Sequence, residues 1–369
     1  MATTTLAPGL TFLWAPILLI SISSAACASS ILGTYPAIFV FGDSLSDTGN
    51  GVLSGSSSAL RTTQFPYGET FPGFPAWRYS DGRVQVDLLA SHLGLPFLNP
   101  YLNSSADFRG GVNYAVAGAT ALNVSLLHSL GVNTSSDLSL DVQISWHLDA
   151  QARAESSDGN IAAFTEGLYV IQIGGDDYTH SYCAKYSPSF VISTLMPLVI
   201  QKIRNAVETL LSSGAKNFLF ISITPVGCSA AMLTNVDGNR DAYGCLEELN
   251  YASYLHGVRI QEEMASLRVL YPDVSFLYMD LFGAYDYIFK HKEMFGFSED
   301  LKACCGAGDE YPYNYNSDDV CNVESVSVCS SPSEYILWDG VHFTDSFNLQ
   351  IFNQTFITGS FIDTSHAFQ

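Results

Sequence analysis

Two short stretches near opposite ends of the chain carry side chains suited to nucleophilic catalysis. The first, residues 41–50, reads FGDSLSDTGN and follows an apolar run. This order places Ser44 at a turn between a strand and a helix, where its hydroxyl is exposed beside backbone N–H groups. Serine is also a preferred helix N-cap, and that structural role alone would explain its presence. A serine hydroxyl becomes a good nucleophile only beside a base, so the catalytic interpretation requires a histidine.

The second stretch, residues 338–342, reads WDGVH and supplies such a histidine. Asp339 and His342 lie three residues apart on a turn that contains glycine. There the carboxylate can accept a hydrogen bond from one ring nitrogen while the other nitrogen faces Ser44. An Asp-x-x-His pair is weak evidence by itself. The two stretches together predict a Ser44–His342–Asp339 triad, provided that the fold brings them to one place.

The elements that would position these residues follow a strand–helix alternation. Short apolar runs predict strands and amphipathic stretches predict helices, which is the pattern of an α/β fold with a parallel sheet. The runs are continuous, as expected for strands covered on both faces. Ligands bind such sheets at the carboxyl ends of the strands, where Ser44 falls. The expected strands are 37–41, 112–116, 168–173, 218–223 and 274–279, and the expected helices are 84–93, 138–152, 189–213, 246–270 and 345–359.

Composition limits the class of partner. The chain has 369 residues, of which 47% are hydrophobic and only 14% charged, so it can bury a large core. It carries 36 acidic against 15 basic residues, a net charge of −21. Such a charge repels phosphate backbones and anionic lipid heads. We therefore expect no nucleic-acid partner.

The N-terminus predicts export. The first thirty residues lack charged side chains, hold an apolar stretch at 10–22 that is too short to span a bilayer, and continue to Ala-Cys-Ala at 26–28. We expect a signal peptide at 1–28, removed to leave one domain at 29–369. The mature protein should be secreted to the extracellular space or cell wall, without stable membrane association. Four acceptor sequons, at Asn103, Asn123, Asn133 and Asn353, favour the same interpretation.

Seven cysteines remain after loss of Cys27, so at least one thiol stays unpaired within a monomer. The group Cys304, Cys305, Cys321 and Cys329 could in principle bind a metal. It lacks paired C-x-x-C spacing and belongs to an exported chain, which favours disulfides.

Together these stretches resemble the plant GDSL-type esterase/lipase family, within the SGNH hydrolase superfamily, over about residues 35–361. The matching segments are 41–50, 111–119 (GVNYAVAGA), 225–228 (PVGC), 244–245 (GC), 303–306 (ACCG) and 338–342. The resemblance implies a three-layer α/β/α sandwich with a five-stranded parallel sheet of the flavodoxin-like type. It also implies an enzyme that hydrolyses carboxylic esters without a cofactor.

The resemblance further implies a role for individual residues. Ser44 is the nucleophile, His342 the general base and Asp339 its orienting acid, while the N–H groups of Ser44 and Gly118 are oxyanion donors. Family precedent pairs Cys228 with Cys245 and the four later cysteines, Cys304, Cys305, Cys321 and Cys329, among themselves. Cys183 is then left free.

One position departs from the family. Its third conserved block reads Gly-x-Asn-Asp, and the asparagine is the third oxyanion donor, but this chain has GGDD at 174–177 and Asp176 at that place. Loss of one donor costs about 3–4 kcal/mol. Either burial protonates Asp176 so that its O–H donates, or hydrolysis has become weak. His180, four residues later, could pair with Asp176 and keep it ionised. Asp176, Asp177 and His180 lack an evident fourth ligand, so we expect no metal.

The substrate is the least determined feature. An aromatic tract at 65–79 follows the nucleophile, and its Tyr67 and Trp77 could contact substrate or could only pack the loop onto the body. The leading hypothesis is a secreted serine esterase that removes acetyl or other short acyl groups from carbohydrates or small molecules. One alternative is an acyltransferase that uses the same acyl-enzyme with an alcohol acceptor. The other is a binding protein weakened as an enzyme by Asp176.

Overall fold

The computed structural model describes residues 1–2, 32–156, 161–318, 320–321 and 327–364. The expected signal peptide lies almost entirely outside the described residues. Contacts between residues divide the chain into two units, 1–30 and 31–369, and the second unit holds every helix and strand described.

A single large sheet forms the centre of the fold. Its strand order is β2-β1-β3-β4-β5-β8, and the first five strands are parallel. They are β1 (Ile38–Gly42), β2 (Gly111–Asn113), β3 (Leu168–Gln172), β4 (Asn217–Ile221) and β5 (Ser275–Met279). Phe39 pairs with Val112 on one side and Tyr169 on the other. The order 2-1-3-4-5 is that of flavodoxin-like folds, as the family resemblance implied.

The expectation of five parallel strands needs one correction. A sixth strand, β8 (Ile362–Asp363), pairs antiparallel with β5 at the edge of the sheet. It has only two residues, so the sequence contains no apolar run from which this strand could be predicted. The second strand is also shorter than expected, because it ends at Asn113 instead of Val116.

Alternate side chains of each strand enter two separate cores, which explains why the strand sequences are continuously apolar. One face of the sheet is mainly aromatic, with Phe39, Phe41, Tyr169, Ile171, Phe218, Phe220, Phe276 and Tyr278. The opposite face is mainly aliphatic, with Ile38, Val40, Leu168, Val170, Leu219, Ile221, Leu277 and Met279. Both faces are therefore covered.

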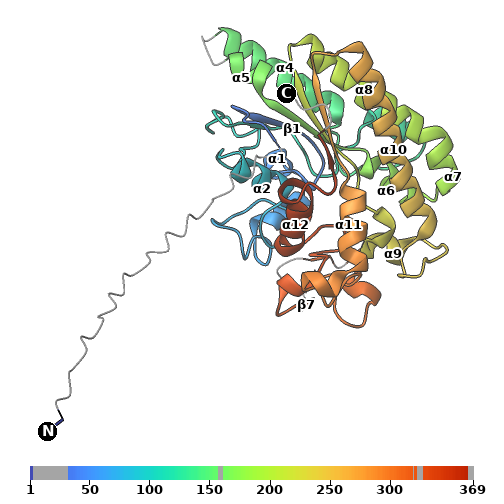
Figure 1. Cartoon of the computed structure of the whole chain (residues 1–369). Coiled ribbons are helices and arrows are strands. Elements are labelled where there is room, and N and C mark those ends of the chain that lie inside the picture. Colours follow the sequence, from blue (N-terminus) through green and yellow to red (C-terminus); the bar gives the residue numbers. More distant parts are fainter. Residues whose placement is uncertain (3–31, 157–160, 319, 322–326, 365–369) are drawn as a thin grey trace. The chain divides into compact units, whose positions relative to one another are not determined.

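Helices form the two outer layers (Figure 1). The aromatic face packs against α4 (Leu140–Ser156), α5 (Ile161–Glu166), α6 (Gly175–Cys183), α8 (Met196–Ser212) and α10 (Glu247–Leu270). The aliphatic face packs against α2 (Gln85–His92), α11 (Leu281–Lys290) and α12 (Asp345–Phe352). The architecture is thus the three-layer α/β/α sandwich predicted from the sequence.

Shorter elements complete the chain. They are α1 (Asn50–Leu53), α3 (Val124–Ser129), α7 (Pro188–Phe190), α9 (Ala230–Asn235) and a hairpin of β6 (Cys305–Gly306) with β7 (Ser327–Val328). The helical run 188–212 is long and apolar enough to cross a membrane. Its inner side chains, among them Val199, Ile203 and Val207, instead pack into the aromatic-face core. We therefore describe this run as a core helix.

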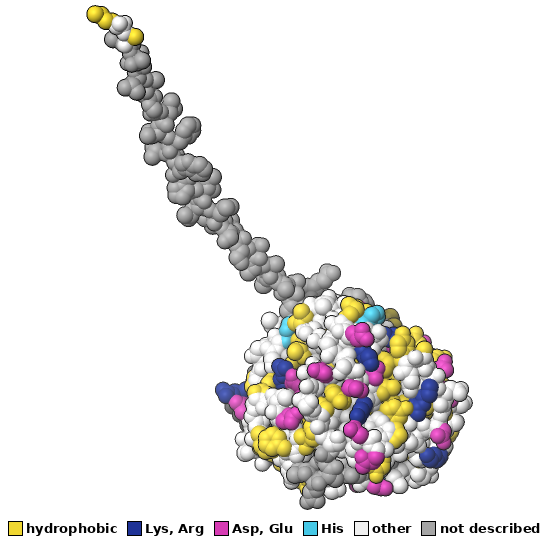
Figure 2. Space-filling model, turned by 90° about the horizontal axis from the view of Figure 1, so that it is seen from below, with side chains coloured by type: hydrophobic (Ala, Val, Ile, Leu, Met, Phe, Trp, Pro, Cys, Tyr) yellow, Lys and Arg dark blue, Asp and Glu magenta, His cyan; other side chains and the backbone are white. Residues whose placement is uncertain are grey.

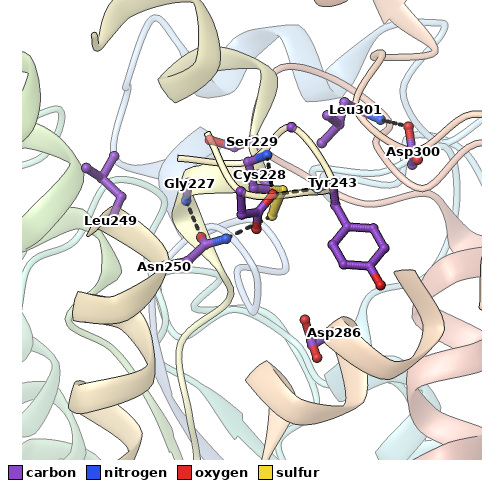
Figure 3. Close-up of a disulfide and its surroundings, with 12 residues drawn as sticks. Gly227, Cys228, Ser229, Tyr243, Leu249, Asn250, Asp286, Asp300 and Leu301 are labelled. Carbon is purple, nitrogen blue, oxygen red and sulfur yellow. Dashed lines mark hydrogen bonds between the residues drawn. A yellow bond between two sulfur atoms is a disulfide. The ribbon is translucent and has the colours of Figure 1, made fainter. Parts of the chain in front are cut away.

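Three disulfides join Cys228 to Cys245, Cys304 to Cys329 and Cys305 to Cys321, and Cys183 is a free thiol. The pairing agrees with the one that the family resemblance implied. Around the first bridge, the N–H of Gly227 donates to Asn250 Oδ1, and Asn250 Nδ2 donates to Cys228 Sγ (Figure 3). The bridge thereby ties the loop after β4 to the start of α10.

The surface carries scattered charges. On the face shown in Figure 2, acidic and basic side chains alternate among polar and apolar ones, and the described residues visible there form no patch of a single sign.

Candidate active site

The fold brings the two predicted catalytic stretches into hydrogen-bond contact. Ser44 Oγ lies 2.8 Å from His342 Nε2, although 298 residues separate them in the chain. His342 Nδ1 lies 2.8 Å from Asp339 Oδ2 and 2.9 Å from Asp339 Oδ1. Asp339 and His342 are 7% and 8% exposed, while Ser44 is half-buried. This is the spatial arrangement of a hydroxyl nucleophile, a base and an orienting acid.

Ser44 follows the carboxyl end of β1, on a turn in which the N–H groups of Ser46 and Asp47 donate to the carbonyl of Asp43. Gln143 of α4 fixes the preceding backbone, because its side-chain amide accepts from the N–H of Gly42 and donates to the Gly42 carbonyl, at 2.9 and 2.8 Å. The next helix, α1, is capped by Gly49. Ser44 is therefore not an N-cap, which removes the structural alternative.

Asp339 and His342 occupy a tight turn. The N–H groups of Val341 and His342 both donate to Asp339 Oδ1, at 2.8 Å. Gly340 is required because a Cβ there would lie 2.2 Å from the Tyr315 ring. Burial favours a higher pKa for Asp339, but the attraction to His342 and the hydrogen bonds from this turn outweigh it and hold the pKa below its usual value. The carboxylate thus stays ionised beside the imidazole.

Aromatic side chains enclose the His342–Asp339 pair. The hydroxyl of Tyr67 donates to Asp339 Oδ2 at 2.8 Å, and the ring is 1% exposed. The Tyr79 ring lies against the imidazole of His342, with 4.6 Å between ring centroids. The sequence did not reveal these contacts, since they join segments far apart in the chain.

Tyr67 and Trp77, the two residues expected to contact substrate, do not line a cavity beside Ser44. Tyr67 is buried behind Asp339, so its ring is not available to a ligand. Trp77 packs over Gly49 and lines a separate cavity of about 360 Å³ that also includes Phe71 and Phe97 but no triad residue. The expectation for Tyr67 is corrected, and the packing alternative describes its ring.

Two backbone N–H groups are candidate oxyanion donors. Within the described residues, the N–H groups of Ser44 and Gly118 have no hydrogen-bond acceptor. Gly118 has φ +76°, and a Cβ there would lie 2.7 Å from the Cβ of Ser135, so only glycine fits. Unpaired donors near a serine nucleophile suit a developing oxyanion.

Asp47 connects the loop of Ser44 to the loop of Gly118. Its buried carboxylate accepts from the N–H groups of Gly49, Asn50, Gly51 and Ala117, at 2.7–2.9 Å. Asn50 Nδ2 adds bonds to the carbonyls of residues 113 and 115. The segments 41–50 and 111–119, which matched the family in sequence, are therefore one hydrogen-bonded unit in space.

Asp176 lies in the first turn of α6, beside the triad. Its Oδ2 is buried and has no hydrogen-bond partner in the part of the chain that the structure describes. Burial raises the pKa of Asp176 to about 6, against the opposing attraction of His342. Burial, followed by repulsion from Asp176, likewise raises the pKa of Asp43. The two carboxyl groups therefore titrate as an interacting pair.

The neighbours of Asp176 make separate contacts. His180 Nε2 lies 3.0 Å from Ser135 Oγ, and no hydrogen bond or ion pair joins it to Asp176 among the described residues. Burial lowers the pKa of His180 to about 4, so this ring is neutral near neutral pH. Asp177 accepts from the N–H groups of Ala121 and Leu122, at 2.7 and 2.9 Å. Pairing with His180 therefore does not keep Asp176 ionised.

Two cavities adjoin the triad. One, of about 240 Å³, includes Asp176, Thr179, Cys183, Met232 and Val341 in its lining. The other, of about 90 Å³, lies beside the His342–Asp339 turn and includes Arg61, Tyr79 and Tyr315. Both are small compared with pockets for drug-sized ligands, which are roughly 300–1,000 Å³.

Comparison with known proteins identifies the family. The model of the GDSL-like lipase/acylhydrolase family matches residues 38–355. The chain belongs to this family. Acetylajmalan esterase 1 of Rauvolfia serpentina is 36% identical over 341 residues, which cover 90% of this chain and 89% of that protein. A GDSL esterase/lipase of Arabidopsis thaliana is 34% identical over 360 residues, which cover 94% of this chain and 91% of that one.

The GDSL-family chain is accordingly a carboxylic ester hydrolase. Among solved structures, a catalytic mutant of an acetylxylan esterase from Geobacillus stearothermophilus is similar at a TM-score of 0.34 and 15% identity, over 70% of this chain and 82% of that chain. A likeness this weak does not bear on the substrate.

Proposed function

We propose that this protein is a secreted serine esterase that hydrolyses acetyl or other short acyl esters of carbohydrates or small molecules through an acyl-enzyme on Ser44. The supporting observation is the chain of contacts from Ser44 Oγ through His342 to Asp339, each 2.8 Å long. A buried, ionised Asp339 orients the imidazole and stabilises the charge that it acquires.

The reaction follows from these contacts. Ser44 Oγ attacks the ester carbonyl carbon while His342 Nε2 takes the hydroxyl proton, and the oxyanion accepts hydrogen bonds from the N–H groups of Ser44 and Gly118. The bond to the leaving oxygen then breaks, and His342 donates its proton to that oxygen, which leaves as an alcohol. Water, deprotonated by His342, then attacks the acyl-enzyme carbonyl. The bond to Ser44 Oγ breaks, His342 returns the proton to that oxygen, and the carboxylic acid leaves.

We propose that protonated Asp176 supplies the third oxyanion donor. Its unpaired, buried Oδ2 has a place for a hydroxyl proton, and its raised pKa of about 6 keeps that proton in mildly acidic solution. Ionised Asp176 would instead repel the oxyanion. The enzyme should therefore act best in mildly acidic solution.

The preference for short acyl groups is supported by the small cavities and by the names of relatives. Three relatives at 35–36% identity are acetylajmalan esterases, so members of this family remove acetyl groups. The 240 Å³ cavity beside Asp176 has room for a short acyl group.

Export is supported by the three disulfides, which persist in oxidising compartments. The side chains of Asn123 and Asn133, two of the sequon asparagines, are exposed on the described surface. Both are therefore accessible to glycosylation.

Stopped-flow kinetics with 4-nitrophenyl acetate tests the proposal. We expect a burst of 4-nitrophenol followed by steady turnover, both abolished in Ser44→Ala. If turnover occurs only after an alcohol acceptor is added, with an acylated product, the acyltransferase alternative is correct instead. If Ser44→Ala and the wild type are equally inactive from about pH 5 to pH 8, the protein is a binding protein and the proposal is wrong.

A further inference from the structure

Arg61 is a cation placed beside the catalytic histidine. It lies in a 3₁₀ turn (Ala59–Thr63), half-buried, and lines the 90 Å³ cavity together with Asp339, His342 and the rings of Tyr79 and Tyr315. Burial raises the pKa values of Tyr67, Tyr79 and Tyr315, and the positive charge of Arg61 opposes that increase at all three. The guanidinium is thus close to the aromatic enclosure of the triad.

The guanidinium has no partner in the described part of the chain, which is unusual here. Of the 15 lysines and arginines, 13 donate to a carboxylate or a carbonyl. The two exceptions among the described residues are Lys216, which is exposed, and Arg61, which lies in a cavity. A half-buried guanidinium that lacks an acceptor is poorly stabilised unless a ligand or water supplies one.

The charges around this cavity select its ligand. Asp339 beside the cavity stays ionised, and the whole chain has a net charge of −21. An anionic ligand is therefore repelled by most of the protein, and the unpaired Arg61 supplies a local attraction. Arginine binds carboxylates in particular, because its planar fork of N–H donors matches two carboxylate oxygens.

We propose that Arg61 binds a carboxylate on the alcohol portion of the ester substrate, so that this enzyme prefers acylated hydroxy acids to neutral esters. This inference rests on the proposed function of Ser44. The cavity lies beside His342, the residue that protonates the leaving oxygen, so its occupant belongs to the alcohol portion. The acyl group would take the other cavity, beside Asp176.

A matched pair of substrates tests this specificity. 4-Acetoxybenzoate and its methyl ester share an acetyl group and an aromatic leaving group and differ in one negative charge. We expect wild type to hydrolyse 4-acetoxybenzoate with a kcat/KM about 10-fold or more above that of the methyl ester, since a hydrogen-bonded charge pair is worth about 1.5–3 kcal/mol. Arg61→Gln should lose this preference, because its kcat/KM should fall more on 4-acetoxybenzoate than on the methyl ester, and Arg61→Lys should retain part of it.

Three results would overturn the proposal. One is an equal loss on both substrates in Arg61→Gln, which would mean that Arg61 only supports the triad. Another is the absence of a preference in wild type. The third is a preference confined to mono(4-nitrophenyl) succinate over 4-nitrophenyl butyrate, which would place the carboxylate on the acyl portion. Failure of the proposed function itself would be distinct, because no burst with 4-nitrophenyl acetate would then depend on Ser44.

An inhibition measurement on the wild type tests the same proposal without a variant, which could fail to fold. Benzoate should inhibit wild-type hydrolysis of the neutral methyl ester competitively and more strongly than benzamide does, and high salt should weaken the inhibition. Equal inhibition by the two compounds would contradict a carboxylate site at Arg61.

Discussion

At the scale of single residues, Tyr67 extends the triad by one hydrogen bond. Its hydroxyl and the N–H groups of Val341 and His342 all donate to the Asp339 carboxylate, which leaves the imidazole one fixed orientation. Tyr67 contacts neither the nucleophile nor a substrate cavity in the described residues. It is therefore a positioning residue.

Tyr67→Phe should lower kcat about 10-fold with little change in KM, because a bond to a charged group is lost without loss of a substrate contact. Steady-state kinetics measure kcat and KM separately. A rise in KM at constant kcat would restore the substrate-contact role that this structure contradicts.

Asp176→Asn should extend activity into alkaline solution. In the wild type, Asp176 loses its proton as the pH rises through about 6, so a donor becomes an anion and the rate falls. The amide of the variant donates at every pH. At about pH 8 the variant should exceed wild type by roughly 100-fold in kcat, the value of one oxyanion donor. If the alkaline limb of the kcat profile lies at the same pH in both proteins, Asp176 is not the group that titrates. As a control, the double variant Ser44→Ala, Asp176→Asn should be inactive, which would show that the activity depends on Ser44.

At the scale of elements, the sequence predicted what local pattern determines. The five parallel strands and five of the helices were recognisable because each buries a continuous or periodic set of apolar side chains. Strand β8 and the β6–β7 hairpin were not predicted, because a two-residue strand is defined by the strand it pairs with and not by its own sequence. Helices α6 and α11, which directly follow strands β3 and β5, were also missed.

In the site, too, residues within local motifs were predictable and residues defined by long-range contacts were not. Ser44, Asp339 and His342 lie in local motifs whose spacing carries their chemistry. Tyr67 and Arg61 carry no such signal. Tyr67 contacts Asp339, and Arg61 lines a cavity beside it, from segments at least 272 positions away in the chain. Neither spacing nor composition can specify contacts that only the folded chain makes.

The disulfides should affect different kinetic parameters. Cys304 and Cys305 donate backbone hydrogen bonds to Leu337 and Trp338, just before the Asp339–His342 turn, whereas Cys228 precedes α9, which lines the 240 Å³ cavity. The double variant Cys304→Ser, Cys329→Ser should mainly lower kcat, and Cys228→Ser, Cys245→Ser should mainly raise KM. Each should lose about 3 kcal/mol of unfolding free energy, from loops of this length.

Each double variant is the control for the other. Steady-state kinetics on 4-nitrophenyl acetate, combined with urea unfolding, separate the two effects. The same kinetic change in both variants would show that the bridges only stabilise the fold.

At the scale of the whole molecule, buried carboxyl groups should make the protein more stable in acid than in mild alkali. Burial raises the pKa values of Asp81 and Asp176 to about 6 and that of Asp177 to about 7. In the unfolded chain, aspartates titrate near pH 3.9. At a pH between the unfolded and folded pKa values, the folded state binds more protons than the unfolded chain does. The free energy of unfolding should therefore fall as the pH rises from about 4 to about 8.

Urea unfolding over this range measures the slope, and salt identifies its origin. Repulsion among surface charges would also weaken the fold as pH rises, but salt screens it, whereas buried carboxyl groups are screened much less. We expect most of the slope to persist at high salt and part of it to disappear in Asp176→Asn. A slope that vanishes in high salt would assign it to the net charge instead.

The carboxylate of Asp47 makes two loops inseparable. If only one of the loops 41–50 and 111–119 were exchanged with that of a relative, the backbone N–H groups of one loop would face an acceptor in the wrong place. If both loops were exchanged together, their hydrogen bonds would be kept. A chimera of this enzyme with a relative should therefore have its crossover points outside positions 41–119.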